Sequence, residues 1–129
     1  MKWNQNDAGR STSLRPKQSL DCVIRAIALA SQKPYDEVYD LMASAGRKSG
    51  RSTPKKVWKE VIHPMGLHYS FPAEKGLPRT TLADFAATFN SGRWVVQLAG
   101  HLTAVVNGEV LDTECPRSNA CVYGAWKFS

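Results

Sequence analysis

Three side chains, Cys22, His101 and Asp112, could together carry out nucleophilic catalysis. A thiolate is a nucleophile, an imidazole can act as its base, and a carboxylate can hold the imidazole in its working tautomer and orientation. The imidazole can then give a proton to the leaving group. These residue types in this order favour a cysteine-dependent hydrolase, provided that the fold brings the three side chains together.

Cys22 stands in the first turn of a helix that the sequence predicts over residues 22–31. Apolar residues from Val23 to Ala28 recur at helical spacing, and Ser19 or Asp21 can cap the start. The unpaired N–H groups and the dipole of a helix N-terminus favour thiolate over thiol. We therefore expect a reactive thiol at Cys22; the alternative is an inert buried cysteine, a common state of free cysteine.

His101 and Asp112 are predicted to lie on the two strands of one hairpin. The dipeptide Asn107-Gly108 is a strong signal for a two-residue turn, which places residue 103 opposite residue 112. His101 and Asp112 are then diagonal neighbours on the same face. Gly100 is expected to leave space beside the histidine ring.

The other elements indicate helices first and strands afterwards, which is an α+β class with N-terminal helices packed on a C-terminal antiparallel sheet. Residues 1–17 are polar with little periodicity, so we expect a flexible segment there, followed by one domain over 18–129. Further helices are expected over 34–45, from 52 or 53 to about 62, and after Thr80 or Thr81, with strands at 67–71, 94–98, 102–106, 109–113 and within 121–128.

Composition is that of one ordinary soluble domain. The chain has 129 residues, of which 43% are hydrophobic and 22% charged. No apolar run approaches the roughly 20 residues needed to span a bilayer. Three cysteines without a signal-type leader favour the cytoplasm, and Cys115 and Cys121 lack the paired spacing of a zinc site. We expect a monomer without cofactor or metal.

The net charge of +6 is concentrated in one stretch without acids. Such a stretch could bind nucleic acid through phosphate contacts, or it could simply be a solvated surface. The basic residues in question are Arg47, Lys48, Arg51, Lys55, Lys56 and Lys59.

Short strings around the three candidate residues resemble the papain-like cysteine peptidase superfamily, in which Cys, His and Asp or Asn occur in this order. They are Asp21-Cys22-Val23-Ile24-Arg25-Ala26, residues 100–108 and residues 110–113. The first string is similar to the nucleophile helix of ovarian-tumour-type deubiquitinases. The strands look closer to bacteriocin-processing and other small bacterial peptidases. The pattern as a whole, including residues 121–126, resembles small phage and bacterial proteins.

This resemblance implies a papain-like fold, a triad of Cys22, His101 and Asp112, and a peptide or protein substrate in a bacterial or phage-infected cell. Papain-like peptidases usually carry an oxyanion-hole glutamine several residues before the cysteine. Here Pro16 stands six residues before it, so Gln18 is the substitute candidate, with the Cys22 N–H as second donor. Trp126 is the candidate for lining the substrate groove.

Several structural alternatives remain open. Asp112 could instead close a turn with Thr113 and Glu114. Arg25 could pair with Asp21 and steady the helix, and Trp58 fits a buried face, as does Trp94. The chain as a whole could also be a non-catalytic interaction protein on a papain-like scaffold, because fold does not dictate function.

Overall fold

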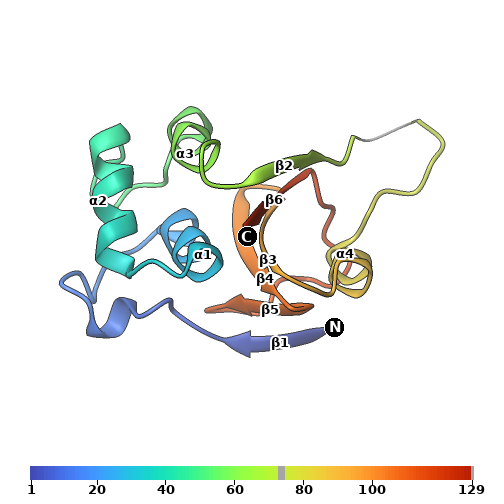
Figure 1. Ribbon diagram of the computed structural model, residues 1–129, viewed down its shortest axis with the longest axis horizontal. Helices are drawn as coiled ribbons and strands as arrows, with labels where there is room; N and C mark the ends of the chain where they lie inside the picture. Colours follow the sequence, from blue (N-terminus) through green and yellow to red (C-terminus); the bar gives the residue numbers. More distant parts are fainter. Residues whose placement is uncertain (73–74, 129) are drawn as a thin grey trace.

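The computed structural model describes residues 1–72 and 75–128 (Figure 1). In this described part, four α-helices accompany a six-stranded mixed sheet with strand order β1-β5-β4-β3-β6-β2, which confirms the α+β class. The helices are α1 (Cys22–Ser31), α2 (Tyr35–Ala45), α3 (Lys55–Ile62) and α4 (Leu82–Thr88). The strands are β1 (Lys2–Gln5), β2 (Leu67–Ser70), β3 (Arg93–Leu98), β4 (His101–Val106), β5 (Glu109–Asp112) and β6 (Gly124–Phe128).

The N-terminus of each helix is set by the residues around its first turn. The helix predicted over 22–31 is confirmed as α1. Thr81 caps α4 by accepting a hydrogen bond from the Asp84 N–H at 3.1 Å. Pro34 and Pro54 are the N-cap residues of α2 and α3. These two helices therefore begin at Tyr35 and Lys55, whereas the sequence predicted starts at residue 34 and at residue 52 or 53. None of the helices in residues 1–72 and 75–128 combines the length and apolarity needed to cross a bilayer.

Strands β3, β4 and β5 form an antiparallel meander through two short turns. Asn107 and Gly108 have φ of 49° and 79°, the left-handed pair that a tight hairpin requires. Val106 pairs with Glu109 and Val105 with Val110, so the predicted register of this hairpin is confirmed. A side chain at position 108 would also meet the Ala86 carbonyl oxygen at 3.2 Å, which is a second reason for glycine there.

The N-terminal segment differs from the expectation of a flexible lead-in. Strand β1 pairs in parallel with β5, and a 3-10 turn follows at Arg10–Thr12, so the sheet is mixed rather than antiparallel throughout. The N–H of Asn6 donates to the Asp112 carbonyl oxygen at 2.9 Å, and Arg15 pairs with Asp36 at 2.8 Å. Backbone pairing and ion pairs order this segment, and hydrophobic periodicity detects neither of them.

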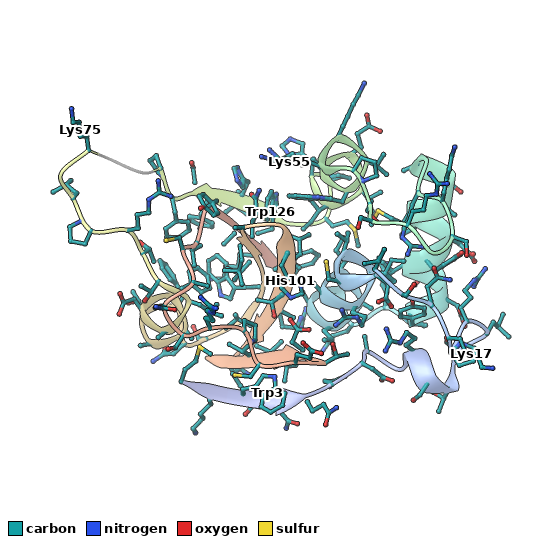
Figure 2. All side chains as sticks on the ribbon, turned by 180° about the vertical axis from the view of Figure 1, so that it is seen from behind. Trp3, Lys17, Lys55, Lys75, His101 and Trp126 are labelled. Carbon is teal, nitrogen blue, oxygen red and sulfur yellow. The ribbon has the colours of Figure 1, made fainter. Side chains whose placement is uncertain are left out.

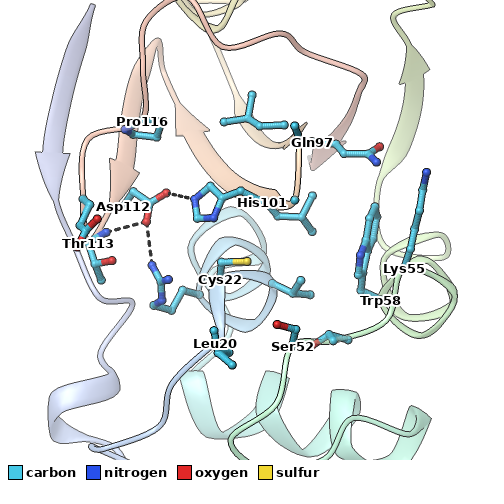
Figure 3. A pocket seen from close by; sticks show the side chains of 18 of the residues that line it. Leu20, Cys22, Ser52, Lys55, Trp58, Gln97, His101, Asp112, Thr113 and Pro116 are labelled. Carbon is cyan, nitrogen blue, oxygen red and sulfur yellow. Dashed lines mark hydrogen bonds and ion pairs between the residues drawn. The ribbon is translucent and has the colours of Figure 1, made fainter.

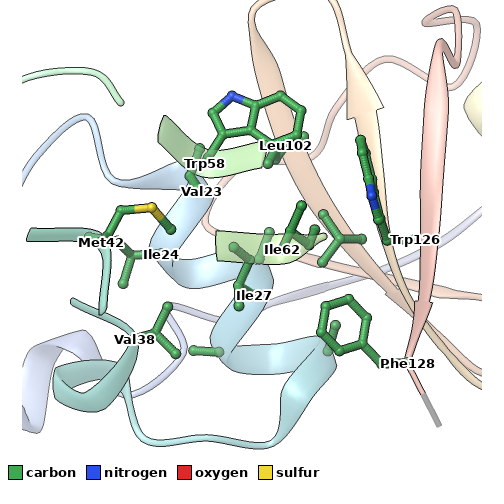
Figure 4. Close-up of a cluster of buried hydrophobic side chains, with 14 of the residues drawn as sticks. Val23, Ile24, Ile27, Val38, Met42, Trp58, Ile62, Leu102, Trp126 and Phe128 are labelled. Carbon is green, nitrogen blue, oxygen red and sulfur yellow. The ribbon is translucent and has the colours of Figure 1, made fainter. Parts of the chain in front are cut away.

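Two apolar clusters fill the two sides of the sheet. One side packs against α1, α2 and α3 and contains Val95, Leu102 and Phe128 from the strands (Figure 4). The other side packs against α4 and contains Val96 and Val105. The alternation of neighbouring strand residues between the two clusters follows from the period of two in a strand. The central strands are therefore covered on both faces, and this fixes α1 against the ends of β4 and β5.

Candidate active site

Cys22, His101 and Asp112 meet where β4 begins, β5 ends and α1 starts (Figure 3). The His101 Nε2 lies 2.7 Å from the Asp112 Oδ2. The thiol of Cys22 lines the same cleft as this ring, and its interaction with His101 lowers the pKa of the thiol. Because Nε2 faces Asp112, Nδ1 is the nitrogen left for sulfur. The structure thus brings together the three side chains that the sequence singled out, from segments far apart in the chain.

The N-terminus of α1 is shaped to favour an anionic sulfur. Asp21 occupies the N-cap but its side chain makes no capping bond, because it accepts instead from Arg10, Arg25 and Tyr35. The first-turn N–H groups are therefore not neutralised by a capping carboxylate. Their partial positive charge acts on Cys22, the first residue of the helix.

The charges of the site stabilise a thiolate beside an imidazolium. Burial by itself raises the pKa of Cys22, but hydrogen bonds from the His101 ring and the Leu102 backbone, with the positive charges of His101 and Arg25, lower it below its ordinary value on balance. The hydrogen bond to Asp112, followed by the one to Cys22, raises the pKa of His101 to about 9. An ion pair of thiolate and imidazolium is the state that these shifts favour.

Asp112 is a buried carboxylate whose oxygens accept four hydrogen bonds. Its Oδ2 accepts from the Thr103 hydroxyl at 2.7 Å besides the His101 ring. Its Oδ1 accepts from the Arg25 Nη1 and from the Thr113 N–H, both at 2.8 Å. Burial raises the pKa of Asp112, but the bonds to His101, Thr103 and Arg25 outweigh it and bring it to about 2. Asp112 is consequently ionised and held in one orientation behind the histidine.

A cleft of about 960 Å³ opens over Cys22 and His101. In Figure 3 the Trp58 ring and the Lys55 side chain stand on one side of Cys22, with Ser52 below them, and Thr113 and Pro116 stand on the other side. Gly100, with φ of 64°, turns the chain from β3 to β4 at the rim. No atom approaches within 4 Å of a Cβ built on Gly100, so the turn itself, rather than a crowded neighbour, requires this glycine.

Gln18 is not part of this cleft. Its Oε1 accepts from the Gly50 N–H at 2.6 Å and from Arg47, and its Nε2 donates to the Ser49 hydroxyl at 3.2 Å. The amide therefore holds the loop between α2 and α3, and its hydrogen-bonding atoms are used there. The prediction of Gln18 as an oxyanion donor is wrong in this structure, which leaves the Cys22 N–H as the donor from the original pair.

Trp126 does not line the cleft either. It is 2% exposed and packs edge-on against Trp58, with ring centroids 5.3 Å apart, and against the His68 ring at 4.6 Å. Figure 2 labels Trp126 and His101 on the central sheet, whereas Lys17 and Lys75 lie at the periphery of the molecule. Trp126 points into the core because its strand is covered on that face by α3. Trp58 is buried as expected, and it is the tryptophan that contributes to the wall of the cleft.

The basic stretch is not one continuous surface. Arg47 is 5% exposed and donates to the Ser19 carbonyl oxygen at 3.0 Å, so it fastens the segment before α1 rather than facing solvent. The remaining members, Lys48, Arg51, Lys55, Lys56 and Lys59, are exposed. The buried arginine is a correction to the predicted patch, and it arises because its guanidinium bonds the Gln18 side chain and the Ser19 carbonyl oxygen.

Two contributors to the site were missed by sequence reasoning. Thr103 stands opposite Asp112 in the hairpin register, so the predicted turn could have revealed it. Arg25 pairs with Asp21, as expected, with its Nε 3.1 Å from the Asp21 Oδ1, but it also pairs with Asp112 across 87 residues of chain. No local pattern signals that second contact.

Among the described residues, no group of three or more His, Cys, Asp or Glu side chains is placed to hold a metal ion. Comparisons with protein-family models, with curated proteins and with solved structures find no match to this chain.

Proposed function

We propose that this protein is a cysteine-dependent hydrolase that cleaves an amide, isopeptide or related acyl bond of a peptide or protein. One observation carries the proposal: a half-buried thiol at a helix N-terminus shares a cleft with a histidine that lowers the pKa of the thiol and is itself bonded to a buried aspartate. That is the arrangement of nucleophile, base and orienting group in covalent acyl transfer. The cleft beside the thiol supplies room for a substrate.

The reaction follows from the charges of the site. The Cys22 thiolate attacks the acyl carbon, and the carbonyl oxygen becomes an oxyanion near the Cys22 N–H. The His101 imidazolium gives its proton to the leaving amine, so the carbon–nitrogen bond breaks and a thioester remains. The neutral His101 then takes a proton from water, whose oxygen attacks the thioester and releases the acid. Cys22 leaves as thiolate and His101 is again protonated.

The same observations support a papain-like architecture. A nucleophilic cysteine at the start of a helix precedes a histidine and an aspartate on successive antiparallel strands, which is the order of that superfamily. The strings that carry the resemblance, residues 21–26, 100–108 and 110–113, fall on α1, on β4 and on β5. We extend the proposal to a peptide-processing enzyme of phage or bacterial type, acting in the cytoplasm as a monomer.

The experiment is competitive alkylation of the three free cysteines at pH 6, followed by intact-mass and peptide-mass analysis. Cys22 is expected to react with iodoacetamide at least tenfold faster than Cys115, which is exposed, and Cys121, which is half-buried. His101→Gln should remove the advantage of Cys22. Equal and slow labelling of all three thiols in the folded wild-type protein would contradict the proposal. A Cys22→Ala variant that keeps hydrolytic activity on a peptide library would contradict it too.

Nucleic-acid binding and a non-catalytic scaffold role are the competing proposals. With Arg47 buried, the basic surface reduces to the exposed residues of the loop after α2 and of α3. Phosphate contacts by them would make duplex binding weaken steeply with salt, so a titration at low and moderate salt tests this idea. A scaffold role predicts that Cys22→Ala leaves partner binding intact while no substrate is turned over.

A further inference from the structure

A chain of alternating charges runs from the reactive pair into the N-terminal segment. Next to His101 comes the Asp112 carboxylate, then the guanidinium of Arg25, then the Asp21 carboxylate, and finally Arg10, whose Nη1 lies 3.0 Å from the Asp21 Oδ1. The Asp21 side chain is 1% exposed and that of Arg25 is 10% exposed. Inside the protein such pairs interact more strongly than on its surface.

Arg25 is the link between the two carboxylates. Its Nε donates to Asp21 at 3.1 Å and its Nη1 to Asp112 at 2.8 Å, so two edges of one planar group hold two segments. The Asp112 oxygen that it bonds is Oδ1, while Oδ2 serves His101. Rotation of the Asp112 carboxylate away from the histidine would break the bond to Arg25. The guanidinium therefore fixes the orientation on which the His101 bond depends.

The charge of Arg25 has a second effect on the pair. A nearby cation stabilises anions and destabilises other cations, so it lowers the pKa of every titrating neighbour. Facing His101 are Cys22 from α1 and Asp112 from β5, while Lys55 from α3 and Glu114 line the same cleft. Facing Arg25 are Asp112 on one side and Asp21 on the other, with Tyr35 and Arg10 beyond.

We propose that Arg25 is a positioning residue of the hydrolytic site, which holds Asp112 behind His101 and offsets its charge so that thiolate and imidazolium coexist at lower pH. This inference rests on the proposed function, because it concerns the same reactive pair. It goes beyond that function in assigning the residue one helical turn after Cys22 a part in setting the working pH range.

The test compares Arg25→Gln and Arg25→Lys with the wild type, measuring the alkylation rate of Cys22 from pH 4 to 10. Loss of the charge in Arg25→Gln should move the acid limb of the profile, which reports the ionisation of Cys22, up by about one pH unit. Lysine keeps the charge but lacks the two-edged fork, so Arg25→Lys should keep the profile in place and lower its plateau several-fold. Arg15→Gln is the matched control, because Arg15 also bonds two carboxylates, Asp36 and Asp40, but on the surface.

A second readout needs no reactivity. The chain has three histidines, so NMR titration of their ring protons follows His101 beside the exposed His63 and His68 in one sample. In Arg25→Gln the His101 midpoint should fall, because the Asp112 carboxylate that raises the His101 pKa is no longer held in place, and the other two histidines serve as internal references. A purely structural role would instead lower the melting temperature and the folded fraction without moving the midpoint.

The outcomes separate the two proposals. If wild-type Cys22 labels rapidly but the folded Arg25→Gln variant keeps the wild-type profile and His101 midpoint, the role of Arg25 is overturned and the proposed function stands. If Arg25→Gln does not fold, an Arg25→Lys plateau equal to that of the wild type overturns the positioning role. Slow labelling of Cys22 in the wild type itself overturns the proposed function.

Discussion

Replacing Asp112 by asparagine is the sharpest test of how the site works. Asparagine keeps the size of the side chain and one acceptor oxygen but removes the negative charge beside His101. In the structure that carboxylate is the first cause of the raised His101 pKa, which stands at about 9 against an ordinary value of 6.5. Without the charge, the imidazolium loses its main stabilising partner and the thiolate loses its counter-ion.

The size of the effect follows from that pKa. The shift from 6.5 to about 9 corresponds to about 3 kcal/mol of preference for the protonated ring, at about 1.4 kcal/mol per unit. The ring is 32% exposed and part of the shift comes from Cys22, so we assign about 2 kcal/mol to Asp112 after allowing for solvent screening. That energy corresponds to a decrease of up to about 30-fold in the population of the ion pair at a given pH.

The assay is alkylation of Cys22 at pH 6, with the folded fraction of each variant followed by circular dichroism. Asp36→Asn is the control, because Asp36 is also paired with an arginine but lies on α2, away from the cleft. Asp112→Asn will lose some stability through its contacts with Thr103 and Arg25, so rates are compared well below both melting temperatures. A folded Asp112→Asn protein that labels as fast as the wild type would refute this account of the imidazolium.

Three further predictions follow from the geometry. Gln18→Ala should leave the rate of peptide hydrolysis within about twofold of wild type, because the Gln18 amide bonds the loop after α2; a loss of about a hundredfold would return Gln18 to the site as an oxyanion donor. Gly108→Ala should lower the free energy of unfolding, measured in urea, by about 1–3 kcal/mol, since the turn needs a φ of 79° and the Ala86 oxygen lies 3.2 Å from the added Cβ. An unchanged free energy of unfolding would contradict this account of the turn. Lys55→Glu should leave Cys22 alkylation near wild type but weaken turnover of peptides with acidic side chains, since Lys55 stands beside Trp58 on the cleft wall; equal turnover of acidic and neutral peptides would count against this.

Local sequence was enough to find the catalytic candidates and two of the elements that carry them. The helix from Cys22 depends on apolar spacing within ten residues. The hairpin depends on Asn107 and Gly108, which adopt the left-handed backbone that few other residues tolerate. Once that turn is fixed, the period of two in a strand decides that His101 and Asp112 share a face. Both elements are therefore predictable from residues that lie close together in the sequence.

The roles that sequence reasoning misassigned all depend on distant neighbours. Trp126 is in the core because α3 covers its strand, and Gln18 is taken by the loop at residues 47–50. The N-terminal segment is ordered because β1 pairs with the edge of β5. No pattern within residues 1–17 indicates that this edge is available. An amphipathic pattern reports whether a residue is buried by its own element, but it does not report which other element lies across from it.

The sequence by itself determined which residues are the candidate nucleophile, base and carboxylate, and the local backbone that presents each of them. Only the tertiary structure decided that they meet, that Arg25 joins Asp112 to Asp21, and that the cleft has Trp58 rather than Trp126 on its wall. The physical reason is the distance along the chain over which each interaction acts. Turns and helices are decided by interactions over a few residues, whereas the pKa values of Cys22 and His101 are set by charges that packing brings together from opposite ends of the chain.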